Sequence, residues 1–227
     1  MEKVVISLGG SIIIPDDRDG AFLHHFASML GPLTDDREIF VVCGGGRIAR
    51  YYITTGRELG AEEEQLDELG IEVTRLNARL LQLALRGLAH DAVPHTIEET
   101  ASQGCRGRVA VMGGTTPGHT TDGVSAALAE KVGASRIVNA TSVDGVHTSD
   151  PHKFDDSVKY ERLTFDELDG MMNKGKHGAG NSHVFDPLGA EIVKRCRIPI
   201  LVVDGRDLEE MRNAILGRKI RGTVIDG

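Results

Sequence analysis

The residues best suited to chemistry lie in one stretch, residues 109–123, where a short apolar run ends in two glycines and a polar loop. The loop holds several threonine hydroxyls and a histidine, and Asp122 then opens an alanine-rich run. A strand, a glycine turn and a helix N-terminus in this order can bind an anion, because glycines let backbone N–H groups approach a ligand and the helix end favours negative charge. An ordinary strand-to-helix turn with a Ser/Thr cap has the same composition.

Two further glycine turns follow apolar runs, at residues 9–11 and 44–46. One such turn is weak evidence, but three in a single chain indicate several backbone cradles for a polyanion. Arg47 and Arg50 follow the second turn and could meet a phosphate, although solvated charges on a helix would look the same. The three turns together favour a phosphorylated small molecule as the ligand.

Two acids are candidates for a role in the site. Asp122 could orient a catalytic group or a metal, or it could simply cap the helix that follows. Asp67 lies just after an acidic segment, where it could accept hydrogen bonds from sugar hydroxyls or remain a solvated charge.

Several familiar motifs are missing. The first apolar run is not followed by Gly-x-Gly-x-x-Gly, and the chain has neither a Gly-x-Ser-x-Gly elbow nor the His pair of a catalytic zinc helix. Residues 170–177 approach a P-loop, but His177 replaces the hydroxyl that binds Mg²⁺ and the segment follows a helix. Its lysines could still reach a ligand.

Composition limits the class of partner. The 227 residues carry a net charge of −8, which argues against nucleic acid as a partner, and no apolar run approaches the roughly 20 residues of a membrane span. The chain enters a predicted strand almost at once, so we expect no signal peptide and a cytoplasmic location. The three cysteines fit neither a disulfide framework nor a zinc site.

The elements that must position these residues alternate along the chain. Apolar runs at residues 4–8, 39–43, 108–112, 136–140 and 198–203 predict buried strands, with amphipathic helices between them. We predict one α/β domain over residues 1–227, with a mostly parallel sheet covered by helices on both faces. Ligands bind such sheets where strands end and loops diverge.

The longest helical pattern covers residues 66–88. Its apolar residues share one face of the predicted helix and are Leu69, Val73, Leu76, Leu80, Leu83 and Leu88.

In order, the motifs are similar to those of the amino-acid kinase family, and most closely to its archaeal-type uridylate (UMP) kinases. They are Gly-Gly-Ser at residue 9, Gly-Gly-Gly-x-x-Ala-Arg at 44, Asp-x-x-Gly-Ile-x-x-Thr-Arg-x-Asn at 67, Gly-Gly-Thr-x-Pro-Gly-His-Thr-Thr-Asp at 113 and Thr-x-Val-Asp-Gly-Val at 141. The likeness runs over residues 4–203. The motifs that begin at residues 67 and 113 are the parts of this likeness that distinguish the uridylate kinases from other members of the family.

The resemblance implies a three-layer αβα fold, a homohexamer and the reaction of UMP and ATP to UDP and ADP with Mg²⁺. For ATP it implies contacts with Gly9, Gly10, Gly45, Arg50, Thr141, His147 and Asp150. For UMP it implies contacts with Gly44, Asp67, Thr115, Thr116, Pro117, Gly118, His119, Thr120 and Thr121. Asp122 and Arg50 would be the catalytic residues, and no protein ligands for the metal are assigned.

The chain departs from the family pattern at two positions. Many relatives place a lysine where this chain has Ser7, so another cation must offset the phosphate charge; Arg50 is our first candidate, followed by Lys174 and Lys176. His147 stands where a tyrosine is common near the adenine.

Two alternatives to UMP kinase are consistent with the motifs. Isopentenyl phosphate kinases usually carry a histidine shortly after the triple glycine. This chain has no histidine there, which argues against the first alternative. A non-catalytic nucleotide- or oxyanion-binding protein of the same fold, like the molybdenum storage proteins, is favoured only by Ser7.

Overall fold

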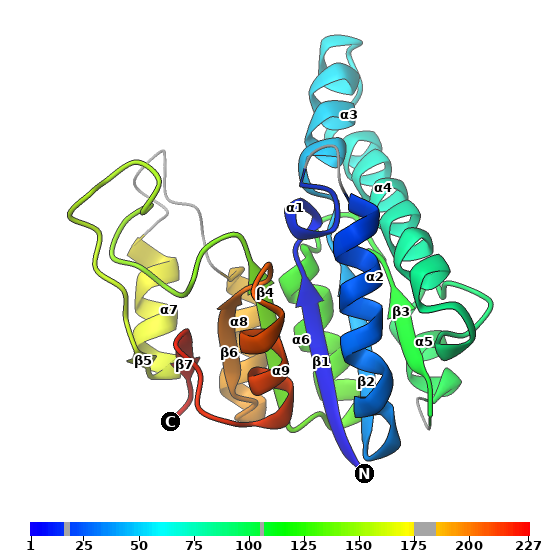
Figure 1. Ribbon diagram of the computed structural model, residues 1–227. Helices are drawn as coiled ribbons and strands as arrows, with labels where there is room; N and C mark the ends of the chain where they lie inside the picture. The colour runs from blue at the N-terminus through cyan, green and yellow to red at the C-terminus, as the bar shows by residue number, and fades with distance from the viewer. Residues whose placement is uncertain (16–18, 105–106, 175–184) are drawn as a thin grey trace.

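The computed structural model describes residues 1–15, 19–104, 107–174 and 185–227 (Figure 1). In these segments the strands form one seven-stranded sheet in the order β3-β2-β1-β4-β6-β7-β5. All neighbouring pairs are parallel except β6 with β7. The strands are β1 (Glu2–Leu8), β2 (Arg37–Cys43), β3 (Val109–Met112), β4 (Arg136–Thr141), β5 (Arg162–Leu163), β6 (Ile200–Asp204) and β7 (Thr223–Ile225).

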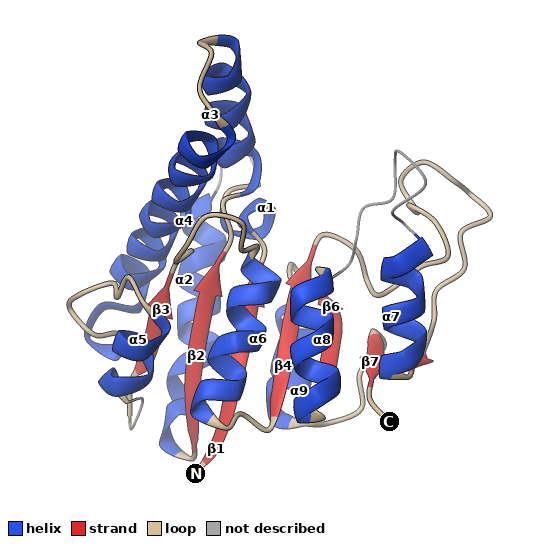
Figure 2. Cartoon of the chain, turned by 180° about the vertical axis from the view of Figure 1, so that it is seen from behind, coloured by secondary structure: helices blue, strands red, loops and turns tan. Residues whose placement is uncertain are grey.

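Helices cover both faces of this sheet (Figures 1 and 2). One layer contains α1 (Gly10–Ile13), α2 (Asp19–Leu30), α3 (Gly46–Glu58), α4 (Glu63–Leu85) and α9 (Leu208–Leu216). The other contains α5 (Ile97–Gln103), α6 (Thr121–Val132), α7 (Phe165–Lys174) and α8 (Pro187–Cys196). Short 3₁₀ turns at Gly31–Asp35 and Arg86–Leu88 follow α2 and α4.

The core lies in two apolar clusters, one on each face of the sheet. Ile6 and Val41 point into the cluster under α2 and α4, whereas Val5 and Val42 point into the cluster under α6 and α8. Consecutive strand residues face opposite sides, so a parallel strand that is buried on both faces needs an unbroken apolar run. The predicted three-layer αβα architecture is therefore confirmed.

The long helix α4 differs from the prediction in position and in its buried face. It begins at Glu63, three residues before the predicted start, with a capping box between Glu62 and Gln65, so that Asp67 lies in its second turn. The face that packs on the sheet carries the buried residues Leu66, Ile71, Val73, Asn77, Ala78, Leu81, Gln82 and Leu85.

Most of the predicted apolar face of α4 points to solvent instead. Leu76 is 65% exposed and Leu83 is 63% exposed, and Leu69 and Leu80 are exposed as well. The helix thus has two apolar faces, and periodicity alone does not say which of them meets the sheet. Residues Leu69, Leu76, Leu80 and Leu83 form what we call the outer stripe of α4.

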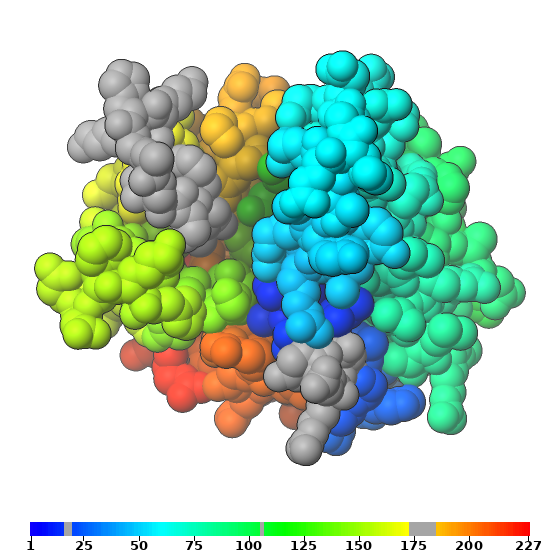
Figure 3. Space-filling model, turned by 90° about the horizontal axis from the view of Figure 1, so that it is seen from above, coloured from blue at the N-terminus to red at the C-terminus, as the bar shows by residue number. Residues whose placement is uncertain are grey.

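Parallel strands bring their following loops to one edge of the sheet. The three glycine turns follow β1, β2 and β3, and Thr141 ends β4, so all four lie at this edge, which we call the carboxyl edge. The hairpin of α3 and α4 rises above it (Figure 1). Seen from above, the surface is hollowed between this hairpin and the loop around residues 146–157 (Figure 3).

No helix in the four described segments is both long enough and apolar enough to cross a bilayer.

Candidate functional site

The first two glycine turns touch each other at the carboxyl edge. A Cβ atom on Gly10 would lie 2.1 Å from the Gly46 nitrogen, 2.4 Å from the Gly45 carbonyl carbon and 2.6 Å from the Gly44 oxygen. All three are backbone atoms, so neither turn can move aside for a side chain. Gly46 also has a φ of +61°, a conformation that glycine adopts without strain.

The third turn joins this pair through Thr121. A Cβ atom on Gly44 would lie 3.1 Å from the Thr121 hydroxyl oxygen and 2.8 Å from the Gly10 nitrogen. The beginnings of α3 and α6 therefore lie close together, and both present the positive ends of helix dipoles at the carboxyl edge. The structure thus brings Gly10, Gly44, Gly45 and Thr121 together, as the sequence predicts.

The threonine loop, residues 113–121, is tied both to α4 and to the residue that precedes α8. The Gly118 N–H donates to Asp67 Oδ2 at 2.6 Å, which joins the loop to α4. The Gly123 N–H donates to the Thr120 hydroxyl, which caps α6 and in turn donates to Asp186. Thr116, His119 and Gly118 remain exposed to solvent, as a loop that receives a ligand requires.

Asp122 lies in the first turn of α6 and accepts a hydrogen bond from the Ser7 hydroxyl at 2.9 Å. Burial raises the pKa of Asp122 to about 7; the Ser7 hydrogen bond opposes this increase and the charge of Asp186 adds to it. Ser7 is only 2% exposed, so this position faces the interior beside α6. Serine there donates one neutral hydrogen bond to Asp122 and supplies no positive charge.

Of the three residues predicted to replace the lysine that is absent at Ser7, the structure describes only Arg50 fully. It is exposed on α3, one turn beyond Gly46, and forms no ion pair with any other described residue. Lys176 and the side chain of Lys174 lie outside the described part of the chain. Arg50 is consequently available to a ligand, whereas Arg57 farther along α3 is paired with Glu63 at 3.1 Å.

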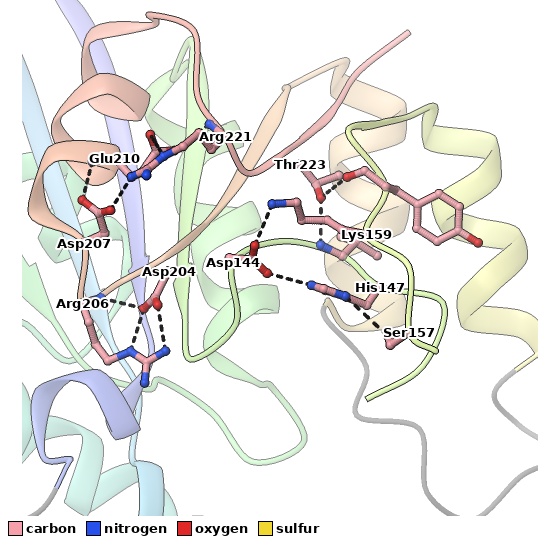
Figure 4. A network of polar contacts seen from close by, with 12 residues as sticks. Asp144, His147, Ser157, Lys159, Asp204, Arg206, Asp207, Glu210, Arg221 and Thr223 are labelled. Carbon is pink, nitrogen blue, oxygen red and sulfur yellow. Dashed lines mark hydrogen bonds and ion pairs between the residues drawn. The ribbon is translucent and has the colours of Figure 1, made fainter. Parts of the chain in front are cut away.

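The residues predicted around the adenine nucleotide lie on and after β4. Thr141 ends the strand, and its carbonyl accepts the Gly205 N–H at 2.8 Å. His147 is held between two partners, with Nε2 2.8 Å from Asp144 and Nδ1 3.4 Å from the Ser157 hydroxyl (Figure 4). Its side chain is only 12% exposed, so little of the imidazole surface is open for stacking on a base.

Asp150 is engaged in the turn that follows. Its carboxylate accepts the backbone N–H of His152 at 3.0 Å and pairs with Lys153 at 3.3 Å. The hydrogen bond from His152 lowers the pKa of Asp150, which keeps the group ionised.

A second polar cluster holds the end of β6 next to this loop. Arg206 forms hydrogen bonds with both carboxylate oxygens of Asp204 (Figure 4). It also donates to the Ser142 carbonyl at 3.0 Å. On the other side, Lys159 pairs with Asp144 at 2.6 Å. These contacts fix the backbone that leaves β4.

Sequence reasoning missed three residues of the site. On α4, Asn77 holds the second glycine turn and Thr74 holds the third, and Asp186 joins the beginnings of α6 and α8. Asp67, Thr74 and Asn77 follow helical spacing, and that line of polar residues was the available signal.

The described residues contain no group of three or more His, Cys, Asp or Glu side chains that could hold a metal ion by themselves. Asp122 and Asp186 are two carboxylates at the end of the threonine loop, where α6 begins. One or two carboxylates suit Mg²⁺ that is held mainly by substrate phosphates and water. The donor set therefore fits Mg²⁺ that arrives with a phosphorylated substrate.

Comparison with known proteins agrees with this geometry. Residues 2–204 match the model of the amino acid kinase family. The chain is 44% identical over 225 residues to a uridylate kinase of Methanoculleus marisnigri, covering 99% of this chain and 96% of that protein. It is 41% identical to a uridylate kinase of Methanocaldococcus jannaschii, covering 99% of this chain and all (100%) of that protein.

Solved structures give the same result. The uridylate kinase of Archaeoglobus fulgidus superposes with a TM-score of 0.86 at 40% identity, covering 99% of this chain and 100% of that one. The UMP kinase of Bacillus anthracis has a TM-score of 0.77 at 21% identity over 99% of this chain and 96% of that one, and it shares the fold. The chain therefore belongs to the amino acid kinase family, and within it to the group of the archaeal uridylate kinases.

Proposed function

We propose that this protein is a UMP kinase, which transfers the γ-phosphoryl group of ATP to UMP and releases UDP and ADP. One observation carries the proposal. The glycine turns predicted for ATP meet the turn and loop predicted for UMP in direct contact, at Gly10, Gly44 and Thr121. Phosphoryl transfer needs two phosphates brought in line and their charge offset, with little covalent chemistry from the protein.

For the acceptor, we assign the threonine loop and Asp67. The hydroxyls of Thr115, Thr116, Thr120 and Thr121 and the N-terminus of α6 suit the uracil edge and the α-phosphate. The Asp67 carboxylate suits ribose hydroxyls, and one of its oxygens already binds the Gly118 N–H. A carboxylate can accept several hydrogen bonds, so the same side chain can serve both partners.

For the donor, we assign Gly9, Gly10 and Gly45 to the phosphates and Thr141, His147 and Asp150 to the surroundings of the nucleoside. The bonds of His147 to Asp144 and Ser157 support a role in shaping the loop beside the nucleoside. Mg²⁺ would arrive with ATP and neutralise phosphate charge, and Asp122 and Asp186 are the carboxylates that would face it.

For the transition state, we assign charge stabilisation to Arg50 in place of the lysine that is absent at Ser7. Its support is that the guanidinium is exposed and unpaired among the described residues, and lies one turn from the phosphate-binding glycines. Asp122 would organise the reacting groups from the floor of the site, next to Ser7.

For the whole chain, we propose a single cytoplasmic domain over residues 1–227 that associates into a homohexamer, with no nucleic-acid or membrane partner. The continuous sheet supports one domain. The outer stripe of α4 supports association, because its residues follow the three- and four-residue spacing of a helix–helix seam and remain exposed in one copy. A hexamer needs a second contact besides this stripe.

The test is ADP release with ATP and Mg²⁺ against UMP, CMP, dUMP, isopentenyl phosphate and acetylglutamate. We expect turnover that is confined to UMP or strongest with it. Turnover strongest with isopentenyl phosphate would assign the chain to that kinase instead. Binding of ATP without turnover of any acceptor would indicate a non-catalytic nucleotide-binding protein.

A further inference from the structure

One face of α4 touches two loops of the carboxyl edge, the threonine loop and the second glycine turn, through three polar side chains. Asp67 accepts the N–H of Gly118 in the threonine loop at 2.6 Å. Thr74 accepts the N–H of Gly114 at 2.5 Å through its hydroxyl oxygen. The positions 67, 74 and 77 are separated by seven and three residues, so they lie one above another along the helix.

Asn77 makes the third contact. Its side-chain amide donates to the Gly44 carbonyl at 2.7 Å and more weakly to the Gly45 carbonyl at 3.4 Å. The Asn77 side chain is 2% exposed and Gly44 is buried. Without the Asn77 amide, the Gly44 carbonyl would therefore lose a hydrogen bond inside the protein. A buried polar side chain in a core-facing position is unfavourable unless it is hydrogen-bonded, and here its donors go to the second glycine turn.

The direction of the Gly44 carbonyl decides what the turn presents to a ligand. In a planar trans peptide, the carbonyl and the N–H of the next residue point in opposite directions. The Gly44 oxygen faces Asn77 on α4, and therefore the Gly45 N–H faces away from α4. A flipped peptide would turn a carbonyl oxygen toward the phosphates, where it would repel them.

Thr74 fixes the third turn in a similar way. A Cβ atom on Gly113 would lie 2.6 Å from the Thr74 hydroxyl oxygen and 2.7 Å from the Arg75 nitrogen, so the turn packs directly against the helix backbone. The Thr74 hydroxyl also donates to the Ile71 carbonyl at 2.6 Å. This bond directs the oxygen lone pairs of Thr74 toward the Gly114 N–H.

We propose that Thr74 and Asn77 are positioning residues of the phosphoryl-transfer site, with Thr74 holding the acceptor loop and Asn77 holding the peptide shared by donor and acceptor. The inference rests on the proposed function, because it uses the assignment of the threonine loop to UMP and of Gly44 and Gly45 to UMP and ATP. Neither side chain needs to touch a substrate.

The first test is a matched pair at one position. Thr74→Val removes the hydroxyl at nearly constant shape, whereas Thr74→Ser retains it. We expect Thr74→Val to weaken UMP binding in calorimetry by about tenfold, the scale of one lost hydrogen bond, with a smaller effect on ATP. Thr74→Ser should restore most of the UMP affinity. Equal UMP affinity in the two variants, or an equal loss for ATP and UMP in Thr74→Val, would overturn the assignment of Thr74.

The second test uses Asn77→Asp. The amide N–H that donates to the Gly44 and Gly45 carbonyls is then replaced by a carboxylate oxygen, which can only accept hydrogen bonds. We expect weaker binding of both nucleotides and a fall in kcat. The control is Gln82→Met, a second buried polar side chain on α4, which donates to the His90 carbonyl away from the site. Melting temperatures of both variants show the structural cost. A loss of affinity in Asn77→Asp no larger than in Gln82→Met would refute the role of Asn77.

The two proposals fail separately. Wild-type protein that binds ATP but does not turn over UMP contradicts the proposed kinase activity, and the ATP affinity of Asn77→Asp then still decides the role of Asn77. Wild-type turnover of UMP with unaffected Thr74→Val and Asn77→Asp variants contradicts only the positioning role. If Asn77→Asp does not fold, the Thr74 pair decides the inference.

Discussion

Asp122 is the clearest case in which a single residue depends on its surroundings. In the sequence it is one acid at the start of a helix, and either a cap or a catalytic group fits that position. In the structure its carboxyl group faces Ser7 and lies near Asp186, and its pKa rises to about 7 because burial disfavours the charge. A lysine in place of Ser7 would stabilise the ionised form; serine does so far less.

The raised pKa predicts how stability varies with pH. A carboxyl group whose folded pKa exceeds its unfolded pKa stabilises the protein below pH 3.8, the unfolded value, and this contribution is lost as the pH rises to about 7. Asp122→Asn has no such titration. We expect the free energy of unfolding of the ligand-free wild type, relative to Asp122→Asn, to fall by on the order of 4 kcal/mol between pH 4 and pH 8.

Urea unfolding of both proteins across this pH range measures the difference directly. A difference that stays constant with pH would show that Asp122 ionises normally in the folded protein.

Arg50 gives a second prediction at the scale of the residue. Arg50→Ala should lower kcat by at least about tenfold, the typical loss for a cation that acts on transferred phosphate. Arg57→Ala on the same helix is the control, because Arg57 pairs with Glu63 near the far end of α3. Steady-state kinetics with saturating ATP and UMP separate the two variants. Similar rates for both would mean that another cation replaces the missing lysine.

At the scale of the element, the glycine turns act as contacts between backbones rather than as flexible hinges. Gly10 is the strongest example, since a side chain there would overlap with backbone atoms of the second turn. Helix α4 adds the complementary constraint through Thr74 and Asn77. The turns are thus held from the sheet side by β1 and from the outside by α4.

Gly10→Ala therefore should both destabilise the protein and separate the two turns. We expect a loss of about 3 kcal/mol in unfolding free energy, as for other overpacked interiors, together with a large drop in ATP affinity. Gly20→Ala on α2 is the matched control, because nothing lies within 4 Å of a Cβ atom there. Thermal unfolding and ATP calorimetry on the two variants provide the comparison. Wild-type ATP affinity in Gly10→Ala would remove the first turn from the site.

At the scale of the whole molecule, the outer stripe of α4 is the most unusual surface feature. Leu76 and Leu83 are largely exposed on a helix whose opposite face packs against the sheet. The same helix carries Asp67, Thr74 and Asn77, so a partner bound to the outer stripe would rest on the element that holds the threonine loop and the second glycine turn. Exposed leucines at this spacing favour association with a second copy.

Leu76→Glu combined with Leu83→Glu should therefore reduce the proposed oligomer to a smaller species in sedimentation velocity. Leu188→Glu on α8 is the control, because the Leu188 side chain is 41% exposed and lies outside the stripe. The expected physical cause is the burial of two charges in an apolar seam, which is costly without partners. An unchanged sedimentation coefficient in the double variant would exclude α4 from the contacts between copies.

The sequence by itself was sufficient for the architecture and for the order of the motifs. Strand runs such as residues 4–8 and 39–43 are apolar except for Ser7, and a strand covered on both faces requires this pattern. The glycine turns could be located in the same way, because each follows directly on such a run. Their meeting at one edge followed from the parallel arrangement alone.

Only the tertiary structure decided which face of α4 is buried and what holds the turns in place. Two apolar faces on one helix satisfy the same periodicity, and the choice depends on packing against strands far away in sequence. The bonds of Asn77 to Gly44, of Thr74 to Gly114 and of Ser7 to Asp122 join residues 33, 40 and 115 positions apart. Local sequence does not encode such pairs, because their energies arise only when the sheet brings the two segments together.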